Sequence, residues 1–388
     1  MAAWRAVLRS GEFPQQHGIT PPPMASAPDR ESSRHLPCLD GLRAVAVSMV
    51  IVSHFGFDGL GGLGVSIFFV LSGFLITTLL LRELDATGSI SLRAFFARRS
   101  LRIFPAYYTF LAFSAAIDFH NGDPRIQPVI VPALFYYLNY YHALNGHSTA
   151  SIAHAWSLAI EEQFYLIWPA VFLLVARRRR EWLPTVLIVA ICTVAVWRTV
   201  AYTVLNLGQA WAYDAFDCRC DALATGCLLA VLLRNEAVAR TASACARRGW
   251  LLLVVLPLIV LIEVVDEGRL RYSIGFTLNA ILIAFVMSQL LAKPEAPVGR
   301  FLESAPLRFI GGISYGMYLY HVWGLTAGWH VTHAHNIPGL LAGYMATIGF
   351  ALVSFYVVEK PFLKLKHRFE AFAVGVGSRP RPSPSVLP

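Results

Sequence analysis

Long apolar runs dominate the chain and do not follow the period of an amphipathic helix or of a half-buried strand. The nearly charge-free runs are Leu42–Phe55, Gly64–Leu81, Ser157–Val175, Leu183–Val204, Trp250–Val265, Ile274–Leu291 and Leu340–Val358. A helix needs about 20 such residues to cross the hydrocarbon core, whereas barrel strands alternate in polarity over about 10 residues. Because the bilayer offers no water to backbone groups, these runs predict transmembrane helices.

The basic residues lie between the apolar runs and predict an orientation. The segment from Arg82 to Arg102 and the run Arg177–Arg180 are strongly basic, which is typical of cytoplasmic loops. Alternation from these two points predicts an all-α, polytopic membrane bundle of about ten transmembrane helices with both termini cytoplasmic. Arg269 and Arg271 are the main exception, since this count places them outside.

The segment between Val129 and Trp156 is apolar but short and rich in tyrosine. If it crossed the bilayer, the four consecutive arginines Arg177–Arg180 would lie outside, against the charge rule. We therefore expect an outer, non-spanning segment that is re-entrant or lies at the interface. A glycine-rich turn, Gly59 to Gly64, is expected between the first two spans.

The ends of the chain differ in composition from the apolar middle. Residues 1–36 contain Pro21–Pro23 and lack the apolar core of a secretory signal, so they predict a disordered N-terminal tail. Residues 37–368 predict one membrane domain, and residues 369–388 a flexible C-terminal tail. We find no internal repeat, and the expected location is the cell inner (plasma) membrane, as a multi-pass protein.

Composition supports the membrane assignment and excludes some partners. Hydrophobic residues make up 56% and charged residues only 14% of the 388 positions, against about a quarter charged in soluble domains. The net charge of +9 comes from residues clustered between apolar runs, so we expect lipid and no nucleic acid as partner. Cys218 and Cys220 flank Arg219, a poor neighbour for a cation, and no metal site is predicted.

Ionisable residues inside spans are costly and therefore mark candidate functional sites. Arg43 and His54 lie eleven positions apart on the first span. At about 100° per residue they share one face, roughly 16–17 Å apart along the axis. Snorkelling of Arg43 to the headgroups and simple packing of His54 are the alternatives.

Two later spans add polar groups. Glu161 and Glu162 lie near the start of the fourth span and point about 100° apart, so one can face a cavity. Their position in the first turns also suits the helix dipole, which is the structural alternative. Tyr318 and His321 are neighbours on one face of the ninth span, where packing and function are equally compatible with the pattern.

These residues sit in segments that resemble the acyltransferase-3 family, membrane acyltransferases of bacterial surface glycans, Nod factors and macrolides. The resemblance covers roughly residues 36–362 and rests on the order of its motifs. They are Leu39–Arg43 with His54, Ile67–Ile76, Arg98–Tyr108, Trp156–Leu158 with Glu162–Tyr165, Arg219–Leu223, and Ser314–His321. Some members carry a further hydrolase-like domain, for which this sequence has no room.

The resemblance implies an O-acyltransferase that uses acyl-coenzyme A, usually acetyl-coenzyme A, without a metal. It implies that Arg43, Arg98, Arg99 and Arg102 bind the anionic donor, and that His54 is the general base or accepts the acyl group itself. Glu161 or Glu162 would orient the imidazole. Substrate contacts are expected from Trp156, Tyr165, Arg219, Asp221, Tyr318 and His321.

The acceptor stays open at the level of sequence. A sugar-containing acceptor, such as a surface polysaccharide or lipid-linked glycan, suits the expected outer position of His54. A macrolide or another small metabolite is the alternative. Tyr136, Tyr137, Tyr140 and Tyr141 could stack on sugar or macrocycle faces, but an interfacial aromatic belt is the favoured interpretation. A proton-coupled transporter is the alternative of another class, although the inverted repeats of many carriers are not found.

Overall fold

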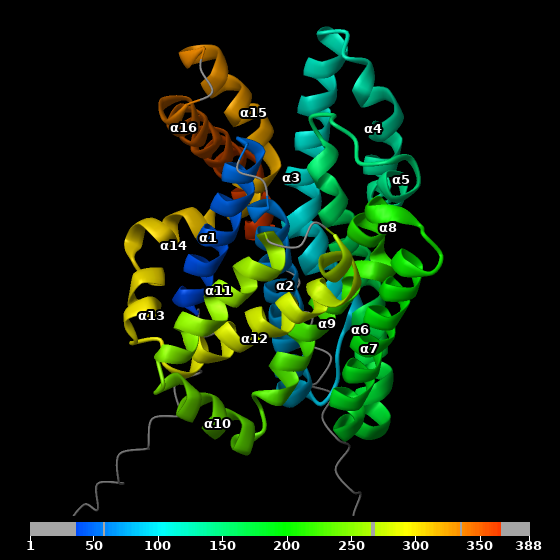
Figure 1. Cartoon of the computed structure of the whole chain (residues 1–388), viewed down its shortest axis with the longest axis vertical. Helices are drawn as coiled ribbons and strands as arrows, with labels where there is room; N and C mark the ends of the chain where they lie inside the picture. The colour runs from blue at the N-terminus through cyan, green and yellow to red at the C-terminus, as the bar shows by residue number, and fades with distance from the viewer. Residues whose placement is uncertain (1–35, 57–58, 265–267, 334–335, 366–388) are drawn as a thin grey trace, which may run out of the picture. The chain divides into compact units, whose positions relative to one another are not determined.

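The computed structural model describes residues 36–56, 59–264, 268–333 and 336–365. Both predicted tails, apart from Leu36, and the end of the predicted membrane domain lie outside these ranges. Every regular element within them is helical (Figure 1). The helices of eight or more residues are α1 (Pro37–His54), α2 (Leu60–Thr87), α3 (Leu92–His120), α4 (Gln127–Leu134), α5 (Leu138–Asn145), α6 (Trp156–Arg179), α7 (Leu183–Thr203), α9 (Phe216–Leu232), α10 (Glu236–Ala246), α11 (Trp250–Val264), α12 (Phe276–Ala292), α14 (Ala305–Gly312), α15 (Ser314–Thr332) and α16 (Ile337–Val353).

Shorter helical elements connect them. They are η2 (Pro124–Ile126), η3 (Ala153–Ala155), η4 (Arg180–Trp182), α8 (Gly208–Asp214), the π-helical turns η5 (Arg271–Gly275) and η6 (Ser354–Glu359), and α13 (Pro297–Leu302).

Several segments are long and apolar enough to cross a membrane. Five such helical segments occur in the described ranges: Pro37–His54, Leu60–Thr87, Ala153–Thr203, Arg271–Ala292 and Ile337–Leu365. The pair α10 and α11, bent by 93°, brings the number to six if it counts as one broken span. The all-α membrane architecture is thus confirmed, while the count of ten crossings and the cytoplasmic termini stay predictions.

Glycines let the backbones of α2 and α9 touch. A Cβ added at Gly73 would lie 1.9 Å from the carbonyl oxygen of Leu223, and one at Gly226 would lie 2.0 Å from that of Val70. Real Cβ atoms do not approach oxygen so closely, so any side chain would push the two helices apart. The two glycines therefore fix how closely α2 packs on α9.

The expected glycine-rich turn between the first two spans is wrong in extent. Gly61, Gly62 and Gly64 lie inside α2, because their missing side chains serve close packing rather than a turn. A Cβ at Gly64 would lie 2.6 Å from the carbonyl oxygen of Ala46 in α1. α2 begins at Leu60, directly after Gly59.

The ninth predicted span begins later than expected. The predicted helix from Phe309 is divided at Ile313 into α14 and α15. Gly311 explains the position of α14, because a Cβ there would lie 2.0 Å from the carbonyl oxygen of Asp40 at the start of α1. Figure 1 shows α14 beside α1, with α15 continuing away toward α16.

The segment between Val129 and Trp156 forms α4, α5 and η3. An eight-residue helix such as α5 is about 12 Å long, well short of the roughly 30 Å hydrocarbon core. These lengths agree with the expectation that this segment does not cross the bilayer.

Candidate active site

Three histidines from distant parts of the sequence meet at the end of α1. The ring centroids of His54 and His321 are 4.6 Å apart, and those of His321 and His154 are 4.5 Å apart. They come from α1, α15 and η3. The fold therefore surrounds the predicted catalytic histidine with two further imidazoles.

Backbone carbonyls fix the tautomer of all three rings. The Nδ1 of His54 lies 2.9 Å from the carbonyl oxygen of Val50, the Nδ1 of His321 lies 2.7 Å from that of Tyr318, and the Nε2 of His154 lies 3.0 Å from that of Leu319. A carbonyl oxygen only accepts, so the facing nitrogen carries the hydrogen. In the neutral rings the opposite nitrogen is left with a free lone pair.

Two of these lone pairs are buried. The Nε2 of His321 and the Nδ1 of His154 have no hydrogen-bond partner in the described part of the chain, and both residues are almost completely buried. Such acceptors cost about 1–3 kcal/mol when left unpaired. A hydroxyl that donates to them would remove that cost.

His54 also lines an open groove. The groove has a volume of about 260 Å³ and is lined by His54, Phe55, Val322, Leu325, Thr326 and Trp329. His54 is exposed, whereas His321, which directly precedes the groove residue Val322 of α15, is buried behind it. The free nitrogen of His54 thus belongs to an accessible imidazole.

Tyr318 and Trp156 pack beside the histidines. The Tyr318 hydroxyl lies 2.6 Å from the Ser157 Oγ and donates to the carbonyl oxygen of His154 at 3.0 Å. Trp156 is buried, with its ring 4.9 Å from that of Tyr213. The structure therefore brings Tyr318, His321 and His54 together, with Trp156 in the adjoining aromatic layer.

The predicted donor-binding arginines divide into two groups. Arg102 is exposed to solvent. It lies within electrostatic range of Arg43, Arg99 and Glu359. The Arg99 guanidinium stacks 3.7 Å above the Tyr165 ring, and its Nε has no hydrogen-bond partner among the described residues. Arg43 pairs with Asp40 one turn earlier, at 2.7 Å.

Arg98 belongs to the second group. Its guanidinium forms an ion pair with Glu83 of α2 at 2.8 Å, and the same carboxylate accepts the backbone N–H of Ser91. Both side chains are largely shielded from solvent. Arg98 therefore joins α2 to the start of α3.

The two glutamates lie with the arginines rather than with His54. Glu161 accepts hydrogen bonds from Ser72 at 2.7 Å and from Tyr165 at 3.1 Å. Glu162 lies within electrostatic range of Arg99. In the described ranges neither carboxylate is hydrogen-bonded to His54, whose ring bonds to Val50.

Arg219 and Asp221 lie in a buried polar layer between α9, α7 and α12. Asp221 pairs with Arg198 at 2.9 Å and accepts from Thr277 at 2.5 Å. The Arg219 guanidinium stacks 3.7 Å from the Phe276 ring and donates to Ser66 at 3.2 Å. Its Nε and one terminal nitrogen lack partners in the described residues, so Arg219 has donors to spare, whereas Asp221 is fully used.

Comparison with known proteins decides the class. An acyltransferase-domain family, acyltransferase-3, matches residues 36–358. The chain belongs to the acyltransferase-3 family. No solved structure matches the chain.

Curated relatives of this acyltransferase carry related names. The peptidoglycan O-acetyltransferase OatA of Listeria monocytogenes is 32% identical over 356 residues, covering 86% of this chain and 57% of the relative. The O-acetyltransferase OatA of Staphylococcus aureus is 30% identical over 369 residues, covering 88% of this chain and 59% of the relative. The chain therefore spans less than two thirds of the length of these relatives. Its class is that of acyltransferases that move groups other than aminoacyl groups.

His154 is the site residue that sequence reasoning about this acyltransferase missed. It precedes Trp156 in a short 3-10 turn, so no helical face linked it to His54. The signal available in the sequence was a histidine two positions before the motif Trp156–Leu158. Its partner His321 was found, because it lies at helical spacing from Tyr318.

Proposed function

We propose that this membrane acyltransferase transfers an acetyl group from acetyl-coenzyme A to a hydroxyl of a sugar-containing acceptor at the cell surface. The O-acetyltransferase names of the relatives support acetyl as the transferred group. The word peptidoglycan in the name of the Listeria relative supports a glycan as the acceptor. A multi-pass arrangement in the plasma membrane is part of the proposal.

One observation carries the mechanism: the Nδ1 of His54 faces the carbonyl of Val50, so its Nε2 is the free base on a groove wall. In the proposed reaction Nε2 takes the acceptor proton as the hydroxyl oxygen attacks the thioester carbonyl. When the tetrahedral intermediate collapses, the carbon–sulfur bond breaks and the thiolate takes the proton from His54. His54 is then neutral again, and coenzyme A leaves as the free thiol.

The arginines support the donor half of the proposal. Arg102 lies within electrostatic range of both Arg43 and Arg99, and the phosphates of coenzyme A would relieve the repulsion that Arg102 feels from these two charges. Arg102 is exposed and the Arg99 Nε is unpaired. Glu161 and Glu162 would then set the position of Arg99 instead of orienting His54.

The acceptor half rests on the histidine cluster. His54 would meet the sugar hydroxyl in the groove, and the free nitrogens of His154 and His321, which are buried behind it, would line the inner side of the site. We propose further contacts with the acceptor substrate from the adjoining layers, made by Trp156, Tyr318 and the unpaired donors of Arg219.

The test is the variant His54→Ala, with His330→Ala as control because His330 is an exposed histidine at the far end of α15. General-base removal lowers turnover about 10²- to 10⁴-fold. Acetyl transfer from radiolabelled acetyl-coenzyme A is measured in proteoliposomes, with donor affinity measured separately. Near-normal turnover of a folded His54→Ala protein would refute the base assignment.

A further inference from the structure

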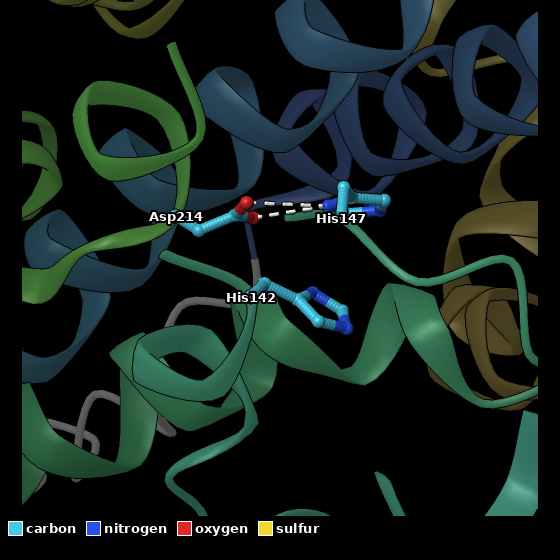
Figure 2. Close-up of side chains that lie close together, drawn as sticks. All are labelled: His142, His147 and Asp214. Atoms are coloured by element: carbon cyan, nitrogen blue, oxygen red, sulfur yellow. Dashed lines mark hydrogen bonds and ion pairs between the residues drawn. The ribbon is translucent and has the colours of Figure 1, made fainter. Parts of the chain in front are cut away.

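A second cluster of ligating side chains lies outside the histidine cluster at His54. His142 comes from α5, His147 from the segment that follows it, and Asp214 is the last residue of α8. One ligand atom from each lies within 4.8 Å of the others. Figure 2 shows the three side chains gathered between the two elements.

Two of the three ligands already stand at the separation that a tetrahedral ion requires. The Nδ1 of His147 lies 3.3 Å from both carboxylate oxygens of Asp214 (Figure 2). Donor atoms bound to zinc at about 2.0–2.2 Å in a tetrahedron lie about 3.3–3.6 Å apart. The distance is long for a hydrogen bond to a carboxylate but fits two ligands of one ion.

His142 supplies the independent observation. Its side chain has no exposed surface, and neither ring nitrogen has a hydrogen-bond partner within the described ranges. Its ring centroid is 4.5 Å from that of His147. A neutral imidazole has one N–H donor and one acceptor nitrogen, and here both are buried without a partner among the described residues. A metal ion would satisfy one of them.

The donor set is one that zinc accepts. Two imidazoles and one carboxylate are the ligands of three-coordinate protein zinc sites, in which a fourth position stays open to water. Asp214 is almost fully buried, whereas the His147 side chain is 44% exposed. Solvent and the ion therefore reach the cluster from the side of His147.

We propose that His142, His147 and Asp214 bind one zinc ion that joins the end of α5 to α8. The ion would fix the segment that carries His147, whose ring lies 6.3 Å from both Trp156 and Tyr213. It would thereby hold the aromatic layer beside the histidine cluster. The sequence predicted no metal site, because the fold alone brings these three residues together.

The proposal is tested on the full-length protein purified in detergent without chelator. Elemental analysis after dialysis against zinc should give about one zinc per chain for the wild type and for His120→Ala, an exposed histidine at the end of α3. His142→Ala and Asp214→Asn should lose the ion. Wild-type protein without bound zinc, or full retention by both ligand variants, would overturn the proposal.

Two further measurements separate loss of the ion from loss of the fold. Cobalt should give the intense visible bands of a tetrahedral site in the wild type and none in Asp214→Asn, which keeps the shape of the side chain. Chelator should lower the thermal midpoint of the wild type and of His120→Ala, because a ligand of the folded state stabilises it. An unchanged wild-type midpoint and spectrum would contradict a bound ion whatever the variants do.

Discussion

At the scale of single residues, hydrogen bonds to backbone carbonyls determine the tautomers of three imidazole rings. His54, His154 and His321 each donate one N–H to a carbonyl, so hydrogen-bond geometry fixes which nitrogen is free. The catalytic proposal depends on this assignment. It predicts different roles for the exposed histidine and for the two buried behind it.

The first prediction concerns His321. Substitution by leucine removes a neutral acceptor beside His54 and should lower kcat of acetyl transfer by about 10-fold or more, with little change in the KM for donor. His330→Leu on the same helix is the control. A raised donor KM with unchanged kcat would place His321 in donor binding instead.

The second prediction separates the arginines. Arg102→Gln should raise the donor dissociation constant by about 10- to 100-fold, as expected for loss of a charge-assisted contact of about 1.5–3 kcal/mol. Arg98→Gln should leave donor affinity near normal and lower stability, since its partner is Glu83. Titration calorimetry and thermal melts of both variants measure this difference.

The control for Arg98 is the charge exchange. Arg98→Glu combined with Glu83→Arg restores the pair in reverse and should recover most of the lost stability. If Arg98→Gln and Arg102→Gln lose donor affinity equally, Arg98 also binds the donor, as predicted from the sequence.

At the scale of elements, close backbone contact sets the packing of α2 on α9. Gly73 and Gly226 each face a carbonyl of the other helix at a distance that no Cβ tolerates. Small residues at such crossings are the usual means by which membrane helices approach. The geometry between Ser72 and Glu161 depends on α2 keeping this position, because Ser72 precedes Gly73.

The third prediction tests that contact. Gly226→Ala should destabilise the protein by about 1–3 kcal/mol through overpacking, although alanine is the better helix former. Gly349→Ala, in α16 with nothing near its added Cβ, should be neutral or stabilising by about 0.5–1 kcal/mol. Thermal midpoints in detergent measure both, and equal midpoints for the two variants would contradict the close contact.

At the scale of the whole molecule, the helical membrane class follows from apolar runs, whereas the course of the chain through the bilayer does not. Composition and length identify five to six candidate spans in the described ranges, fewer than the ten predicted from alternating charge. Helices such as α3 and α15 are not among these candidate spans, because the arginines of α3 and the histidines and tyrosines of α15 lower the mean hydropathy.

The fourth prediction tests the topology. A thiol reagent that does not cross membranes should label Thr149→Cys in intact cells above the background of wild type, and Ser89→Cys only after the membrane is opened. Both positions are exposed in the structure. Labelling of Ser89→Cys in intact cells would reverse the predicted orientation.

The sequence was informative about this site where the chemistry lies along one helix. Arg43, His54, Tyr318 and His321 follow helical spacing, and the structure gathers the last three. Glu161 was expected near His54 but lies with Ser72 and Tyr165, since spacing along a helix does not say which neighbour a side chain meets. His142, His147 and Asp214 meet only through the fold.

The locked imidazoles also limit how the site can reset. A proton wire through His54, His321 and His154 would need the rings to release their carbonyls and turn over, because the hydrogen that each ring would pass on faces a backbone carbonyl, which is not a base. The proton collected by His54 therefore has no outlet through its neighbours. The proton can leave only on the departing sulfur or into the groove. In the proposed reaction each cycle would therefore end with the hydroxyl proton of the acceptor bound to the coenzyme A thiol.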